Sequence, residues 1–275
     1  MVEYLRFSRC LRVVVISLWI VLAEGICTTS IAHAQPSIPK ERIPRSIPTQ
    51  VRKRLEQLYS DNAKTRCKAS ESLGRMGKKA KIAVPFLASM LSDKSSYPLW
   101  LEGDMTVTEC VASALGQLGD PGFEVLVAAL REGEPNVRAR AAQYLGNSRN
   151  PRAIPALVEA LWQEGYGDHN EIRFARDGMV FALGKLAAIE PLIEALRDER
   201  IRFGVQQELA GIGRAVIIPL IEALQDSNPD IQGGAAKVLR DMTGEDFGLD
   251  ATRWQSWWKK HGMWKRLRKS IKIDF

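Results

Sequence analysis

Apolar residues recur along the middle of the chain in short blocks with helical spacing. The block PLIEAL at 191–196 is repeated without change at 219–224, and related blocks stand at 155–161, 85–91 and 125–130. A leucine or isoleucine followed by glycine precedes each block, at Leu73-Gly74, Leu115-Gly116, Leu145-Gly146, Leu183-Gly184 and Ile212-Gly213. Two signatures that recur in a fixed order indicate a repeat architecture.

Each repeat is predicted to form two short antiparallel helices. Ala141, Ala142 and Leu145 lie at i, i+1 and i+4, on one helical face. One hairpin buries only about six aliphatic side chains, at roughly 1.5–3 kcal/mol each, while ordering ~30 residues costs about 1–2 kcal/mol per residue. Strand signals are weak throughout. We therefore expect an all-α fold, an α-solenoid of about five to six stacked helical hairpins.

The repeats resemble HEAT repeats, specifically the phycobilisome-lyase HEAT-like type found in bilin lyases. The resemblance rests on AAQYLG at 141–146, NPRAIPALVEAL at 150–161, and NPDI at 228–231 leading into Ala235-Ala236. It extends over residues 62–243 and implies an armadillo-like helical superhelix. For function, it implies a protein-binding surface or a lyase-like accessory role toward a chromophore or a modified protein.

The first 34 residues are typical of a secretory signal peptide. Three arginines precede an apolar run at 13–23, and Ala32-His33-Ala34 fits a cleavage site. Glu24 ends the run short of the ~20 residues that a spanning helix needs. We predict export to the periplasm or beyond, with an uncleaved N-terminal membrane anchor as the alternative.

The rest of the chain is predicted to contain five segments. They are a Pro-rich linker (35–48), an N-terminal capping helix (49–61), the HEAT-like repeats (62–243), a Trp-rich C-terminal cap (244–262) and a basic tail (263–275). Trp254, Trp257 and Trp258 lie at i, i+3 and i+4, which favours a cover for the last repeat. A ligand-stacking platform is the alternative.

The net charge of +7 is unevenly distributed. Residues 251–275 hold eight basic residues and one acidic residue, whereas 69–250 hold 19 basic and 26 acidic residues. Solvated surfaces would account for this pattern. The alternative is an anionic envelope surface as partner of the tail, and nucleic acid is unexpected for an exported chain. The tail residues concerned are Trp264, Lys265, Arg266, Arg268 and Lys269.

Two cysteines, Cys67 and Cys110, follow the signal segment. Both are expected near the middle of neighbouring helices, which pack about 8–10 Å apart, whereas a disulfide needs Cα atoms within about 7 Å. We therefore expect two buried thiols, with a disulfide, which export permits, as the alternative. A lipid anchor at Cys27 is disfavoured, because Ile26 stands where such a signal needs a small residue.

Catalytic and metal-binding motifs were not found. The sequence has no His-Glu-x-x-His and no Cys-x-x-Cys motif. Gly178 and Gly184-Lys185 have the wrong spacing for a phosphate-binding loop, and Leu186 stands where a hydroxyl is needed. The sequence therefore favours a non-enzymatic protein with no catalytic residue, no cofactor and no metal.

Three glutamates, Glu159, Glu194 and Glu222, occupy one position in three repeats. We expect them in a row about 10 Å apart per step, which is too wide for paired acid–base catalysis at about 5–9.5 Å. They form either an ordinary solvated surface or an acidic strip for a basic partner.

Two connections, 92–109 and 162–171, are longer than the others. Long loops on a rigid stack commonly carry binding sites, and we expect both at one edge, roughly 20 Å apart. Tyr97, Trp100, Tyr166 and His169 would then flank a site for a protein or peptide partner; alternatively, their rings pack onto the body. The leading functional hypothesis is an exported scaffold or adaptor for such a partner.

Overall fold

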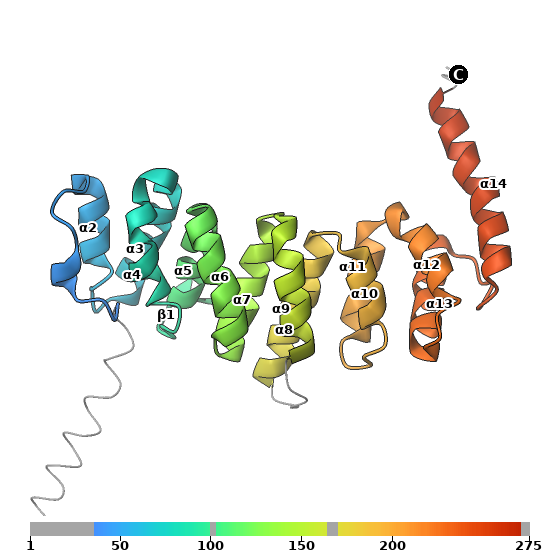
Figure 1. Cartoon of the computed structure of the whole chain (residues 1–275), viewed down its shortest axis with the longest axis horizontal. Coiled ribbons are helices and arrows are strands. Elements are labelled where there is room, and N and C mark those ends of the chain that lie inside the picture. Colours follow the sequence, from blue (N-terminus) through green and yellow to red (C-terminus); the bar gives the residue numbers. More distant parts are fainter. Residues whose placement is uncertain (1–35, 100–102, 164–169, 271–275) are drawn as a thin grey trace, which may run out of the picture. The chain divides into compact units, whose positions relative to one another are not determined.

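The computed structural model describes residues 36–99, 103–163 and 170–270, and is mostly helical (Figure 1). The predicted signal peptide lies outside the described residues. The chain divides into two compact units, residues 1–125 and 126–275. Helical hairpins make up most of the described part of both, so the predicted all-α repeat fold is confirmed.

The first unit contains four helices and a β-hairpin within residues 36–99 and 103–119. The helices are α2 (Thr49–Gln57), α3 (Ala63–Met76), α4 (Val84–Ala88) and α5 (Val107–Gln117), with 3₁₀ turns at Lys40–Arg42 and Gly77–Ala83. The Asn62 side chain accepts a hydrogen bond from the Thr65 N–H and so caps α3. Thr106 and Glu109 form a capping box at the start of α5.

The first helices of the two hairpins in this unit, α3 and α5, pack very closely. A Cβ atom added to Gly74 would lie 2.8 Å from the Cα of Ala114. Real Cβ atoms do not approach this closely, so the contact needs glycine on α3 and a small residue on α5.

The hairpin consists of β1 (Ser96–Leu99) and β2 (Gly103–Thr106), with Tyr97 opposite Met105. It lies within the long connection at 92–109 and contacts α3 and α5. The sequence did not predict these strands, because four residues are too few to show a sustained alternation of apolar and polar positions.

Helix α6 (Asp120–Glu132) leads into the second unit, in which the helices form two layers (Figure 1). One layer contains α7 (Pro135–Asn147), α9 (Asn170–Lys185), α11 (Arg202–Ile212) and α13 (Pro229–Thr243). The other contains α8 (Ile154–Gln163), α10 (Ile189–Ala195) and α12 (Ile217–Ala223), with 3₁₀ turns at Pro151–Ala153 and Arg214–Val216. Successive helices of the first layer pack on one another, which is the stacking expected of a solenoid.

One repeat position in this layer is always a fully buried leucine: Leu145, Leu183, Leu209 and Leu239. In α11 this residue is Leu209, so the Ile212-Gly213 pair is not the equivalent of the earlier Leu-Gly pairs. Gly213 instead ends the helix with a φ of 84°. The sequence pattern therefore placed this repeat about one turn too late.

At a second repeat position, near the start of α7 and α11, an arginine ties the helix to the preceding turn. Arg138 donates to the carbonyl of Gly133 (2.8 Å) and Arg202 to that of Leu196 (2.7 Å). In the first unit, Arg66 does the same with Ser60 (2.7 Å). Because the side chain reaches back five or six residues each time, it satisfies a carbonyl that the turn leaves open.

The last helix, α14 (Ala251–Ser270), packs on α12. Trp254 is fully buried and donates from its indole nitrogen to the carbonyl of Gly248 (3.0 Å), while Trp257 and Trp258 stay half-exposed. None of the described helices is both long and apolar enough to cross a membrane.

Candidate functional site

Only one of the four loop aromatics predicted to flank a partner lies in the described residues. Trp100, Tyr166 and His169 lie outside them. Tyr97 is half-buried, donates a hydrogen bond to the sulfur of Cys67 (3.6 Å), and lies under the amino group of Lys64 (5.8 Å to the ring centroid). Burial, followed by the Glu71 carboxylate, raises the pKa of Tyr97. Tyr97 thus packs onto the body, as in the alternative interpretation of these aromatics.

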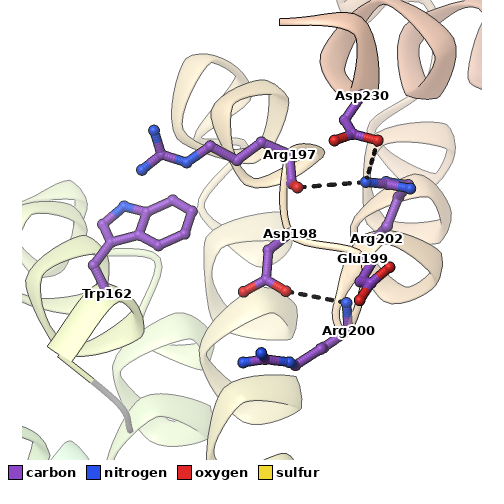
Figure 2. A pocket seen from close by; sticks show the side chains of 7 residues that line it. All are labelled: Trp162, Arg197, Asp198, Glu199, Arg200, Arg202 and Asp230. Carbon is purple, nitrogen blue, oxygen red and sulfur yellow. Dashed lines mark hydrogen bonds and ion pairs between the residues drawn. The ribbon is translucent and has the colours of Figure 1, made fainter. Parts of the chain in front are cut away.

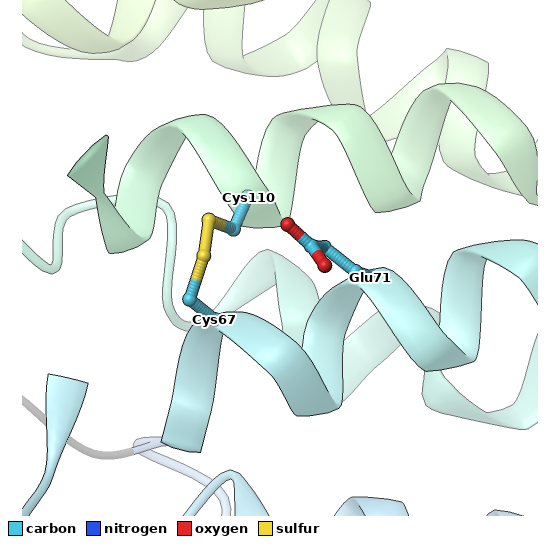
Figure 3. Close-up of side chains that lie close together, drawn as sticks. All are labelled: Cys67, Glu71 and Cys110. Carbon is cyan, nitrogen blue, oxygen red and sulfur yellow. A yellow bond between two sulfur atoms is a disulfide. The ribbon is translucent and has the colours of Figure 1, made fainter. Parts of the chain in front are cut away.

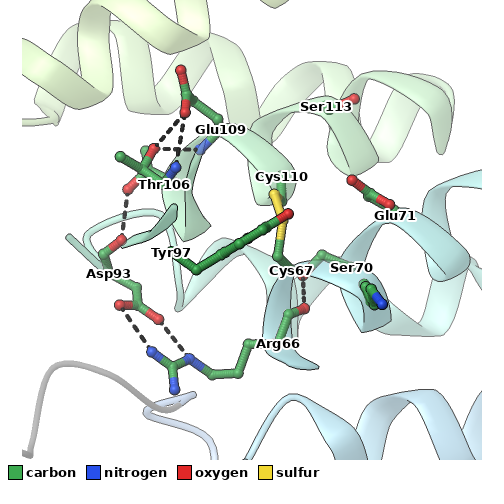
Figure 4. The surroundings of a disulfide bond; sticks show 12 residues. Arg66, Cys67, Ser70, Glu71, Asp93, Tyr97, Thr106, Glu109, Cys110 and Ser113 are labelled. Atoms are coloured by element: carbon green, nitrogen blue, oxygen red, sulfur yellow. Dashed lines mark hydrogen bonds and ion pairs between the residues drawn. A yellow bond between two sulfur atoms is a disulfide. The ribbon is translucent and has the colours of Figure 1, made fainter. Parts of the chain in front are cut away.

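The two cysteines form a disulfide, contrary to the expectation of separate thiols (Figure 4). The Cα atoms of Cys67 and Cys110 are 5.2 Å apart. The expected helix spacing was too wide, because Gly74 and Ala114 let α3 and α5 approach more closely than average helices do.

The three repeated glutamates lie on equivalent helices of one layer, at Glu159 of α8, Glu194 of α10 and Glu222 of α12. Two of them are paired with arginine: Arg131 lies 2.9 Å from Glu159, and Arg197 lies 2.5 Å from Glu194. The charge of this row is therefore partly balanced. The predicted strip is one of mixed charge rather than a purely acidic one.

A pocket of about 390 Å³ opens beside this row, at the end of α8 (Figure 2). Its walls come from the end of α8, the turn between α10 and α11, and the starts of α11 and α13. The lining residues are Trp162, Arg197, Asp198, Glu199, Arg200, Arg202 and Asp230. Trp162 is the last residue but one of α8 and the first residue of the predicted binding connection at 162–171.

Trp162 and Arg197 form the centre of this pocket. The Arg197 guanidinium lies 4.3 Å from the centroid of the Trp162 ring, and the same arginine is paired with Glu194. The indole is half-exposed and the guanidinium is exposed, so both are accessible from solvent. Such cation–π pairs contribute about 0.5–1 kcal/mol at exposed sites.

The polar wall of the pocket is held rigidly by the turn behind it. Arg202 donates to the Leu196 carbonyl and is paired with Asp230 (2.9 Å). Asp198 accepts from the Arg200 N–H (3.0 Å) and is paired with the buried side chain of Arg176. Three arginines face three carboxylates here, so the wall is polar but close to neutral. This arrangement suits a polar peptide segment better than a small anion or a metal ion.

The sequence predicted a binding site in the neighbourhood of this pocket but did not indicate its arginines. The connection that begins at Trp162 was selected for its length and aromatics. Arg197, Arg200 and Arg202 read as ordinary surface charges in the sequence. The available signal was the arginine that recurs seven residues before the buried leucine in three of these helices, at Arg138, Arg176 and Arg202.

An apolar groove of about 290 Å³ lies between α12 and α14. Its lining residues are Ile218, Ile221, Glu222, Gln255, Trp258 and Lys259. Ile218 is 53% exposed, and the Arg214 guanidinium lies 5.0 Å from the Trp258 ring centroid. The predicted tail residues Trp264, Lys265, Arg266, Arg268 and Lys269 follow on the same helix; the structure describes the backbone there but not the side chains.

Comparison with known proteins agrees with this fold. Residues 102–171 match the family of HEAT repeats. Comparison with curated proteins found no match. Two similar solved structures both share 20% sequence identity with this chain.

The first of these structures is the complex of CpcE and CpcF of phycocyanin lyase from Nostoc sp. PCC7120. The similarity covers 75% of this chain and 82% of that chain, with a TM-score of 0.42. The second is an engineered protein, for which 72% of this chain and 100% of that chain are covered, with a TM-score of 0.35.

The family match spans the segment from β2 to α8, and the helices after it repeat the same hairpin with the same buried leucine position. Over this segment the chain is therefore similar to HEAT-repeat proteins, and the helices after it continue the same pattern.

Proposed function

We propose that this chain is an exported, non-enzymatic scaffold that binds a protein or peptide partner at the pocket around Trp162 and Arg197. The half-exposed Trp162–Arg197 pair on a rigid polar wall carries this proposal. Tryptophan and arginine are enriched among the residues that dominate binding energies. Repeat proteins also present long surfaces to their partners.

The charges around the pocket indicate the chemistry of the partner segment. Arg197 and Arg200 are exposed, and so are Glu199 and Asp230. A segment that carries both acidic and basic side chains can pair with the arginines and with the carboxylates of the pocket, whereas a polyanion would be repelled by the carboxylates. We therefore favour a polar peptide segment of mixed charge, with a flat or aliphatic side chain against Trp162.

Export is supported by two independent features. The first is the predicted signal peptide at residues 1–34. The second is the Cys67–Cys110 disulfide, a bond that persists in oxidising compartments and is rare in the cytosol.

Site-specific photo-crosslinking tests the location of the partner site. A benzoylphenylalanine replaces Glu199 at the pocket or, as a control, Glu190 at the opposite end of α10, and the protein is exposed to envelope extract. We expect an adduct with a discrete protein from position 199 only, and its loss when Trp162→Ala is added. Equal adducts from both positions, or an adduct that survives Trp162→Ala, would contradict the proposal.

A second candidate function, binding to an anionic envelope surface, is favoured by the groove between α12 and α14. The exposed Ile218 lies with Trp258 and Lys259 there, and aromatic side chains beside basic ones are typical of such surfaces. Deletion of residues 259–275, which removes Lys259 from the groove together with the basic tail, should then abolish binding to vesicles that contain phosphatidylglycerol, and unchanged binding would remove this candidate. A lyase-like accessory role stays a prediction of the family resemblance alone.

A further inference from the structure

The carboxylate of Glu71 lies beside the disulfide, next to Cys110 (Figure 3). Cys67 and Glu71 are one helical turn apart on α3, and Cys110 lies opposite them on α5. The two sulfur atoms and a carboxylate oxygen all lie within 4.8 Å of one another. Within the described ranges, this is the one cluster of three or more His, Cys, Asp or Glu side chains that converges in this way.

The ion pair that Glu71 forms does not explain why its carboxylate lies beside the disulfide. Its ion pair, with Arg75, is 3.7 Å long, and that arginine side chain is 70% exposed. Exposed pairs of this kind contribute little to stability. A disulfide carries no charge that would attract a carboxylate, whereas a bound cation would.

We propose that reduction of the disulfide turns this cluster into a binding site for a zinc-class divalent cation. Cys67 and Cys110 would supply two thiolates and Glu71 one carboxylate oxygen, with water in the fourth position. In a tetrahedral zinc site the ligand atoms are about 3.6–3.8 Å apart, as follows from Zn–S and Zn–O bonds of ~2.3 and ~2.1 Å. The 4.8 Å cluster can reach these separations by rotation of side chains, with the helices in place.

The surroundings suit such a site. The close contact of Gly74 with Ala114 fixes the spacing of α3 and α5 one to two turns away from the sulfurs. The Tyr97 hydroxyl, which donates to the sulfur of Cys67, can keep that bond to a thiolate ligand. Outer hydrogen bonds of this kind orient metal ligands and stabilise them.

The disulfide and the metal ion exclude each other, because the same two sulfurs serve both. A dithiol reductant supplies two electrons and two protons, which convert the disulfide to two thiols while the reductant becomes a disulfide itself. Binding of the cation then releases the two thiol protons. The site is therefore present only in the reduced chain.

The test uses the full chain with Cys10→Ser and Cys27→Ser, so that the only cysteines are those of the site. The chain is prepared in oxidised and reduced form and titrated with Zn²⁺ against a chromophoric chelator, and separately with Cd²⁺. We expect the reduced form alone to bind one ion, with a near-ultraviolet thiolate-to-cadmium absorption. Glu71→Gln should weaken zinc binding by about tenfold or more. The exposed Glu56→Gln on α2 is the matched control and should have no effect.

Two results would overturn the proposal. One is a reduced chain that holds zinc no more tightly than the oxidised chain. The other is a Glu71→Gln variant that binds like Glu56→Gln, which would remove the carboxylate from the site. The oxidised chain serves as the folded reference that cannot bind, so the outcome does not depend on a cysteine variant that fails to fold.

Discussion

At the level of single residues, close packing depends on a few small side chains. Gly74 against Ala114 and Gly146 against Ala182 each bring two helices of one layer together. The sequence showed these glycines as part of a repeated pair, which is typical either of a helix end or of the close approach of a neighbouring helix. The sequence could not show that these glycines set the spacing of the helices. From the average spacing of packed helices, the distance between Cys67 and Cys110 was therefore predicted to be too long for a disulfide. The error came from one local contact and not from the fold.

Gly146→Ala should be strongly destabilising. The new Cβ would lie 2.6 Å from the Cα of Ala182, so the α7–α9 contact must open. We expect a loss of about 1–3 kcal/mol in the free energy of unfolding, measured by chemical denaturation. Gly233→Ala on α13 meets nothing within 4 Å and should be neutral or stabilising by up to about 1 kcal/mol. Equal effects of the two changes would refute the packing argument.

Glu208 on α11 should make the stability of the fold depend on pH. Burial raises the pKa of Glu208, and Lys185 only partly opposes this. Because the folded chain holds the proton more tightly than the unfolded chain, stability is lost as the pH rises through the raised pKa. Glu208→Gln should therefore have a higher Tm than the wild type at pH 8, and the difference should shrink toward pH 4. A Tm difference that stays the same from pH 4 to pH 8 would contradict the raised pKa of Glu208. The exposed Glu190→Gln is the control.

At the level of helices and turns, the sequence predicted the hairpins well and their connections poorly. Proline and the apolar blocks marked the second helices of the repeats correctly. The β-hairpin at Ser96–Thr106 was missed because its strands are short. The arginines that tie turns to helices were missed because a charged side chain in a helix normally faces solvent. Arg66 departs from this expectation, since its side chain is 1% exposed.

Removal of one partner from the buried pair of Arg66 and Asp93 should strongly destabilise the first unit. Arg66 Nε lies 2.8 Å from Asp93, and both side chains are 1% exposed. Asp93→Ala would leave a buried guanidinium without its counter-ion, at about 3–5 kcal/mol. Replacement of both residues, by Arg66→Met with Asp93→Ala, should cost less than the single change, as measured by urea denaturation. A double variant at least as unstable as the single one would contradict this view.

For the molecule as a whole, one covalent bond links two helices of the first unit. The disulfide joins residues 43 apart in sequence, so its removal frees a long loop in the unfolded chain. The second unit has no comparable constraint among its described residues, and its cohesion rests on the stacked leucines and paired arginines. The sequence predicted the solenoid and a surface for partners. It could not give the pocket, which forms only where three turns far apart in sequence meet.

Reduction of the disulfide should lower the unfolding free energy of the first unit by about 4 kcal/mol, the loop-entropy value for this separation. Hydrogen exchange read by mass spectrometry can follow both units in one sample, in the chain with Cys10→Ser and Cys27→Ser. We expect faster exchange in α3 and α5 after reduction and no change in α9 and α11. Equal acceleration in both units would show that the bond stabilises more than its own unit.

The affinity of the crosslinked partner for pocket variants tests the central claim most directly. Binding of this partner to the wild type is compared with binding to Trp162→Ala, Arg197→Ala and the control Glu190→Ala, by isothermal titration calorimetry. The account predicts dissociation constants about tenfold or more higher for the two pocket variants and an unchanged value for the control. Wild-type affinity in both pocket variants would contradict it.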